Sequence, residues 1–514
     1  MLVKKTAPAP AGAKEWIGLG VIAVPCLIYA MDLTILHLAM PTIAAEFKPS
    51  AAQLLWMVDI YGFMVAGFLI TMGTLGDRIG RRKLLLIGAG AFAVTSTLAA
   101  FATSAPMLIL ARGLLGIAGA TLAPSTLSLI RNMFLDDRQR TFAIGVWVAC
   151  FSAGAALGPL VGGAMLSVFW WGSVFLLNLP VMLALIVLGP IFLPEYRAPQ
   201  SGRLDLVSAL MSLIAVLSVI YGLKQMAQGA AAILVAAPII FGTLVGVLFV
   251  RRQFTAREPL LDLALFGSRA FAATLLINIL AIFVAFGVFF FIAQYFQLVL
   301  GWGPFMAGVW TAPGGLASVA GSMMVSLLVR YARPAQAIAG CFVLAAFALA
   351  LLSQAGGPGG FWLIFVGYVL MAFAFGPLGA LTTDLVMTSV PPSKAGSASG
   401  ISETSFEFGA ALGIALLGSL TMALYGRSID AAFTGDAAGA PAAAARDTLA
   451  AAVALAAQLP EGQAERLLSV ARSAYVDAFA VTAVLCAIMA IVGAVIALTL
   501  LDTPRLNAAI RSTR

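Results

Sequence analysis

The chain has 514 residues, of which 62% are hydrophobic and 10% are charged, and its formal net charge is +8. A soluble globular protein carries about 25% charged residues, so this composition excludes a soluble fold and indicates a membrane protein with many spans. The positive charge does not favour a nucleic-acid partner, because the basic residues fall in short loops between apolar runs and follow the topology rule of membrane proteins.

Apolar runs bounded by charges, Gly or Pro predict fourteen transmembrane helices, most of them at or above the length that crosses a bilayer. The first run lacks a clear cleavage site, so we expect an uncleaved first span rather than a signal peptide. The fold class is therefore an all-α polytopic membrane protein. In chain order the spans lie near residues 16–43, 52–75, 84–104, 107–131, 140–166, 172–194, 205–223, 230–250, 270–299, 304–329, 335–354, 361–390, 395–425 and 475–501.

The basic residues predict the orientation of these spans. Most of the 29 Lys and Arg residues fall in the tails and loops on one side, and Lys48 and Lys224 are among the few assigned to the other side. The positive-inside rule places the richer side in the cytoplasm. We therefore expect both termini to be cytoplasmic.

The predicted helices divide as six, two and six, which suggests two transporter repeats with an inserted pair. The corresponding domains are 1–200, 201–255 and 256–514. The long outer loop, about 426–474, is rich in helix-forming residues and is divided by Pro460. It predicts two short helices folded as a hairpin outside the membrane.

Several classes of site are disfavoured. The four cysteines lie far apart in apolar spans and form no CxxC or Cys/His cluster, and the single histidine rules out a multi-histidine metal site. No GxxxxGK[ST] loop is present, so ATP is not expected to be used. A membrane sensor or enzyme stays a remote alternative, because no nucleophile-with-histidine arrangement is visible. The cysteines are Cys26, Cys150, Cys341 and Cys486.

The stretch "GTLGDRIGRRK" between the second and third predicted helices is the most specific motif. Its glycines allow close helix approach and a tight turn, its aspartate can cap the next helix or pair with an arginine, and its basic residues hold the loop inside. We assign a conformational role to Gly73, Gly76, Asp77, Arg78, Gly80 and Arg81.

Further motifs follow in register along the chain. "GAALGPLVGG" in the fifth helix contains Gly154, Gly158, Pro159 and Gly162, which we expect to kink the helix and pack it tightly. The others are "MDLTILHLAMP", "RGLLGIAGA", "WGSVFLLNLP", "EPLLDLALF" and "SKAGSASGISETSFEFGAALG". Together with the loop motif they make the chain similar to the fourteen-helix drug:proton antiporters of the major facilitator superfamily, and in particular to the QacA and SmvA type.

The resemblance implies a proton-coupled antiporter of the bacterial inner membrane that exports quaternary ammonium compounds and other amphipathic organic cations by alternating access. It needs no cofactor besides protons and is expected to be a monomer. A natural metabolite or antibiotic as the substrate stays an alternative. Two departures are His37, where the pattern has another small polar residue, and "AGVWTAPGGLASVAGSM" in the tenth helix, which lacks the acid of some QacA-like pumps.

Ionisable residues inside spans are costly and indicate function. Asp32 is expected to carry the proton with Arg112 as its electrostatic partner, although a static buried pair is the alternative. His37 follows Asp32 by five residues, about 140° around the helix, so it is more simply a packing residue than a relay. The six residues of interest are Asp32, Asp59, Arg112, Asp384, Glu403 and Glu407.

Glu403 and Glu407 are four residues apart and share one helix face. Two such carboxylates titrate as a unit, and together with aromatic faces they suit a cation, so we assign both to substrate and Glu407 also to proton coupling. Asp59 is expected to be a second cation contact, and Asp384 a gating or structural residue. Candidate aromatic wall residues are Trp56, Tyr61, Trp147, Phe175, Phe291, Tyr295, Trp310 and Phe406.

Overall fold

The structure is a computed structural model that describes residues 11–49, 51–197, 205–227, 230–256, 259, 261, 263–354, 356, 360–391, 394–433, 445–446 and 448–501. Throughout these residues the regular structure is helical. The described residues contain thirteen helices that are long and apolar enough to cross a membrane, and a bent pair adds a fourteenth span if its two parts cross as one. The expected all-α polytopic fold is confirmed. In lipid such helices satisfy their own backbone groups, which is why apolar runs of this length adopt them.

The first six spans contain eight helices. The fourth span is interrupted after Gly119 and the sixth begins with a short separate turn. The bounds are α1 Ala13–Phe47, α2 Ala51–Ile79, α3 Arg81–Ala100, α4 Ala105–Gly119, α5 Leu122–Met133, α6 Asp137–Val168, α7 Ser173–Leu176 and α8 Asn178–Phe192.

The next two spans are α9 (Leu206–Ala227) and α10 (Ala232–Thr255), which pack against each other along their length. Helix α9 also packs against α2 and α16, so this pair is joined to both groups of helices. The domain boundaries expected at residues 200 and 255 stay a prediction.

The remaining spans are built from longer helices. A π-turn, η2, continues α11, and α12 and α13 meet at a 43° bend. The bounds are η1 Leu263–Gly267, α11 Arg269–Gln294, η2 Tyr295–Val299, α12 Pro304–Met323, α13 Val325–Tyr331, α14 Pro334–Leu352, α15 Gly360–Thr388, α16 Ala395–Ala432, α18 Leu449–Ala456, α19 Glu461–Ile496 and η4 Ala497–Leu501.

Of the two short helices expected to form a hairpin outside the membrane, the second is not a separate short helix. The first, α18, is short, but Glu461 begins α19, which runs without a break into the last span. Pro460 precedes this helix, a position where its missing N–H costs no helical hydrogen bond. The helix of the last span therefore begins several turns earlier than expected.

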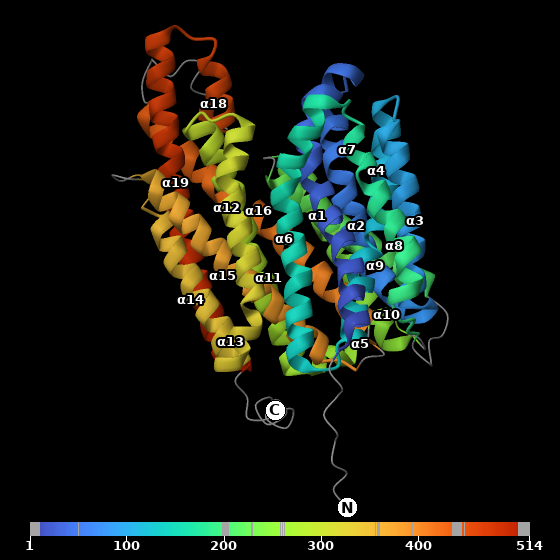
Figure 1. Cartoon of the computed structure of the whole chain (residues 1–514). Coiled ribbons are helices and arrows are strands. Elements are labelled where there is room, and N and C mark those ends of the chain that lie inside the picture. The colour runs from blue at the N-terminus through green and yellow to red at the C-terminus, as the bar shows by residue number, and fades with distance from the viewer. Residues whose placement is uncertain are drawn as a thin grey trace, which may run out of the picture.

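Figure 1 shows two groups of helices side by side, with α1–α8 in blue to teal and α12–α19 in yellow to red. Each group has its own apolar core, one centred on α1–α8 and the other on α11–α19. The groups meet along α6 with α12 and along α2 with α16. This two-body arrangement leaves a central interface in which a site can be formed.

Candidate functional site

Asp32 on α1 and Arg112 on α4 form a buried ion pair inside the first group of helices. Arg112 Nη1 lies 2.8 Å from Asp32 Oδ2, and each side chain is about 1% exposed. The Arg112 guanidinium also donates to the Met57 carbonyl at 3.2 Å and lies 4.8 Å from the Tyr61 ring centroid. The partner expected for Asp32 is therefore the one that contacts it.

A second donor to Asp32 comes from α8. Asn178 Nδ2 donates to Asp32 Oδ1 at 3.2 Å and to Ser96 Oγ at 2.9 Å. Asn178 stands inside the "WGSVFLLNLP" motif but was not among the expected site residues. A lone amide in an apolar run is the signal that could have identified it, because a buried amide needs polar partners.

The glycine motif of α6 holds α1 at close range on either side of Asp32. A Cβ at Gly154 would collide with the Leu27 carbonyl, and one at Gly158 would lie 3.1 Å from the Met31 carbonyl. Gly162 continues this stripe against Ile35. Helix α6 runs through these positions as one helix, and its glycines pack closely against α1. The side chains of Pro159 and His37 lie outside the described part of the structure.

A central cavity of about 460 Å³ lies between the two groups of helices. It is lined by residues of α1, α6, α11, α12, α15 and α16, and its two acidic residues are Glu403 and Glu407. Within the described residues, no cationic side chain forms an ion pair with either carboxylate. The cavity therefore offers two carboxylates that an incoming cation can meet.

Aromatic rings surround this acid pair. Of the expected wall residues, Trp147 and Phe406 line the cavity, and Tyr29, Phe286, Phe289 and Tyr368 line it without having been expected. Their rings meet edge to face, with Phe286 5.4 Å from Phe406 and Phe289 5.8 Å from Tyr368. Such faces attract cations, and quaternary ammonium groups are recognised in this way.

The wall also carries polar groups. Ser152 on α6 and Ser318 on α12 lie 3.1 Å apart across the two groups of helices. Asn278 on α11 accepts from Thr382 and donates to Ser405 at 3.1 Å. Asn278 is a lone amide in an apolar span, the same signal that Asn178 carries.

The other aromatic candidates do not line this cavity. Tyr61 and Phe175 lie beside Arg112. The other four lie outside the cavity lining, two in the core of the second group and two in separate aromatic contacts. A helix presents one face to the cavity, and an aromatic on another face packs elsewhere. These four are Phe291, Tyr295, Trp56 and Trp310.

Asp59 is also placed away from the central cavity. It forms an ion pair with Lys224 of α9, so it is not a direct wall residue. The sequence predicts that Lys224 lies in a loop, but it lies in the last turn of α9.

The loop motif joins the two groups at the end expected to face the cytoplasm. Asp77 accepts from the backbone N–H groups of Gly396 and Ser397 at 3.1 and 3.0 Å, and its Oδ1 pairs with Arg81 at 2.7 Å. The expected arginine pairing is present, but the helix that Asp77 caps is α16, not the next helix in the chain. The positive helix N-terminus favours this carboxylate.

Glycines permit this crossing. A Cβ on Gly73 would run into the Gly396 backbone, so the two helices touch main chain to main chain. Gly80 has φ 112°, a conformation that disfavours side chains, and it forms the turn into α3. Gly76 packs beside Leu84 in the first turns of α3, and Arg78 is partly buried in the last turn of α2.

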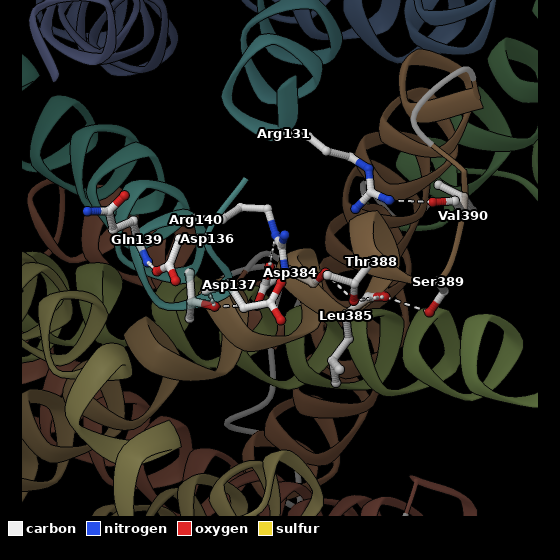
Figure 2. Close-up of polar contacts among 11 residues, drawn as sticks. Arg131, Asp136, Asp137, Gln139, Arg140, Asp384, Leu385, Thr388, Ser389 and Val390 are labelled. Atoms are coloured by element: carbon white, nitrogen blue, oxygen red, sulfur yellow. Dashed lines mark hydrogen bonds and ion pairs between the residues drawn. The ribbon is translucent and has the colours of Figure 1, made fainter. Parts of the chain in front are cut away.

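A second polar cluster closes the same end, as Figure 2 shows. Asp384 on α15 accepts from Arg140 Nε at 3.2 Å and from Thr141 Oγ1 at 2.6 Å, both on α6. Arg140 also pairs with Asp137, and Arg131 donates to the Val390 carbonyl. Asp384 therefore contacts the first group of helices and not the cavity.

The profile of the Major Facilitator Superfamily matches residues 24–414 of this chain. The chain is 42% identical to the multidrug efflux pump LfrA of Mycolicibacterium smegmatis over 94% of its own length and 95% of the pump. It is 33% identical to the methyl viologen resistance protein SmvA of Salmonella typhimurium over 90% and 93% of the two chains. The human organic anion transporter MFSD10 (TETRAN) shares the fold, with a TM-score of 0.59, 15% identity and coverage of 93% and 99%.

Proposed function

Because this chain belongs to the Major Facilitator Superfamily, we propose that it is a proton-coupled antiporter that exports amphipathic organic cations by alternating access. It is a transporter in a bacterial inner membrane, and its small-molecule substrate passes between the two groups of helices. The observation that carries the proposal is the central cavity, in which two carboxylates without ion-pair partners among the described residues face an aromatic wall. The names of two relatives support the proposal, since LfrA is a multidrug efflux pump and SmvA a methyl viologen resistance protein.

The cavity suits a cation for a simple reason. Glu403 and Glu407 lie on one face of α16, and two carboxylates in low dielectric resist being charged together. A bound cation relieves their repulsion, and so does a proton. Substrate and proton therefore compete for the same two groups, which is the requirement for exchange transport.

Asp32 would supply the second protonation site. It is sealed from the cavity by burial, and Arg112 and Asn178 hold its carboxylate in place. Protonation of Asp32 would release Arg112 from its ion pair and leave its charge without a counterion. The two groups of helices would then be expected to rearrange around α1 and α4, so that proton entry changes the exposure of the cavity.

The cytoplasmic-end contacts would act as the gate. Asp77 and Asp384 each join one group of helices to the other, so they must separate before the cavity can open at that end. The glycine contacts between α2 and α16 define where the groups pivot or part.

Purified protein in liposomes tests this function. Adding a quaternary ammonium compound to protein at low buffer strength should release protons, and an imposed proton gradient should drive its uphill transport. Asp32→Asn should abolish uphill transport, because the residue can no longer take up a proton. Uphill transport by that variant would contradict the coupling role of Asp32.

A natural metabolite or antibiotic is a second candidate substrate. The specific support is the polar part of the cavity wall, where Asn278, Ser152 and Ser318 offer hydrogen bonds that a quaternary ammonium ion does not need. Glu403→Gln and Glu407→Gln would separate the two candidates. They should impair export of cations strongly and leave export of an uncharged polar substrate largely intact.

A further inference from the structure

Lys224 is a cationic side chain within the transmembrane region, at the outer end of α9. Its ammonium forms an ion pair with Asp59 of α2 and lies 4.7 Å from the centroid of the Phe63 ring. The two side chains are 34% and 24% exposed, so the pair is partly enclosed between helices. A lysine in such a place is costly unless it has a function or a partner.

The pair lies where α2, α9 and α16 meet. Phe63 of α2 and Ile220 of α9 are buried in one apolar cluster, against which Phe408 of α16 packs. Ser419 of α16 donates to the carbonyl of Met226, two residues after Lys224, at 3.4 Å. Helix α16 thus contacts the Lys224 side with one face while it presents the acid pair to the cavity with another.

Lys224 lies close to the part of α16 that carries the acid pair. Phe408 directly follows Glu407, and it packs against the cluster of Phe63, whose ring centroid is 4.7 Å from the Lys224 ammonium. Lys224 does not line the cavity itself. Its positive charge is fixed behind the acid-bearing segment, where it acts on a cation bound at the two glutamates.

We propose that Lys224 is a specificity-determining residue that makes the cavity favour singly charged over doubly charged organic cations. This inference rests on the proposed export of cations. Repulsion between Lys224 and a ligand scales with the charge of the ligand, so a dication is penalised twice as strongly as a monocation. Attraction to the two glutamates scales in the same way, so Lys224 reduces the advantage that a dication would otherwise have.

Asp59 has the complementary part in this arrangement. Its carboxylate neutralises much of the lysine charge and holds the ammonium on α2, which limits the repulsion. Removing Lys224 and removing Asp59 should therefore change the preference in opposite directions. A purely structural ion pair would change it in neither direction.

Equilibrium binding to the purified full-length protein tests the proposal. Ethidium serves as the monocation and methyl viologen, measured by displacement, as the dication. The quantity compared is the Kd of ethidium divided by the Kd of methyl viologen, which rises when the dication is favoured. Lys224→Gln should raise the relative affinity for methyl viologen about tenfold, the size of one partly screened charge interaction. Lys224→Arg keeps the charge and should leave the ratio unchanged.

Two further variants keep the test decisive. Asp59→Asn should lower the relative affinity for the dication, because it leaves Lys224 without its counterion. In the double variant Asp59→Asn/Lys224→Gln the same ratio of Kd values should stay above that of the wild type. This separates the effect of losing the lysine charge from the effect of leaving Asp59 unpaired. Should Lys224→Gln fail to fold, the ratio measured for Asp59→Asn decides the question.

The outcomes are distinguishable. An unchanged ratio in Lys224→Gln or Asp59→Asn, or a change in Lys224→Arg as large as in Lys224→Gln, would overturn the inference and leave the proposed export of cations standing. Failure of the wild-type protein to bind either cation would instead refute the proposed function.

Discussion

The two groups of helices each contain an acidic site, and the two sites differ in what surrounds the carboxylates. Asp32 in the first group is about 1% exposed and has an arginine and an asparagine as partners. Glu403 and Glu407 line the cavity at the edge of the second group, without an ion-pair partner among the described residues. Burying a charge is strongly unfavourable unless it is paired and hydrogen-bonded. A paired acid can therefore be sealed in the core, whereas an unpaired acid pair needs a cavity that admits water, protons or a cation.

This difference predicts two kinds of response to mutation. Changes at the buried pair should affect both stability and energy coupling. Changes at the cavity pair should affect substrate handling and leave the fold intact. Each experiment below compares one site with the other or with a matched control.

The largest effect is expected from Arg112→Met. It leaves Asp32 buried without its counterion, which costs about 3–5 kcal/mol of unfolding free energy, and it should also abolish uphill export. Denaturation of the purified protein and transport in liposomes measure the two effects. Arg446→Met, which breaks the exposed Arg446–Asp430 pair, should cost less than about 1 kcal/mol. Equal losses in the two variants would remove the distinction between a buried pair and an exposed one.

Next in size are Glu403→Gln and Glu407→Gln. Each removes one carboxylate charge from the cavity and should lower cation export about tenfold, with little loss of stability. Glu461→Gln, on the exposed first turn of α19, is the same chemical change away from the cavity and should have no effect on export. If both cavity variants unfolded as readily as Arg112→Met, the acid pair would be structural.

Asp384→Asn should shift the equilibrium between the form in which the cavity is closed at the cytoplasmic end and the form in which it is open there. It weakens the contacts with Arg140 and Thr141, which are expected to stabilise the form closed at the cytoplasmic end by about 1–3 kcal/mol. Spin labels at the exposed positions Arg138 and Tyr331 would report a longer distance between α6 and α13. Asp430→Asn should not change that distance, and an identical distance in Asp384→Asn would argue against a gating role.

The smallest effect concerns the aromatic wall. Phe286→Ala should weaken binding of a quaternary ammonium ion about two- to fivefold through loss of its cation–π contact, while Phe286→Tyr should retain binding. An uncharged ligand of the same shape separates this contact from the loss of apolar surface. Phe101→Ala, at an exposed ring outside the cavity, is the control. Equal losses for the charged and uncharged ligands would show that Phe286 contributes only apolar contact.

The transmembrane helices could be predicted from the long apolar runs because a span is a local property of the sequence. About 20 consecutive apolar residues form a helix in lipid whatever their neighbours are, and the part of the chain that the structure describes contains thirteen such helices, or fourteen with the bent pair. The same holds for the acid pair, since Glu403 and Glu407 are four residues apart on one helix. Predicting the pairing of Asp32 with Arg112 required a further rule, namely that ionisable groups inside spans pair with one another.

The aromatic wall could not be read in the same way. Phe286 and Phe289 carry no local signal that separates them from the other phenylalanines of the chain, and Trp310 and Tyr295 looked equally suitable but lie outside the cavity. Which face of a helix borders the cavity depends on the rotation of each helix against its neighbours. That rotation is set by packing between distant segments.

The sequence by itself determined the membrane class, the spans, the family resemblance and which residues carry charge within the lipid, because each follows from composition or from spacing along one helix. Only the tertiary structure decided which charges meet. It placed Asp77 on the N-terminus of α16, Asp384 on Arg140, and Lys224 on Asp59. Each of these contacts joins segments far apart in the chain, and the packing of whole helices, rather than any local pattern, brings them within reach.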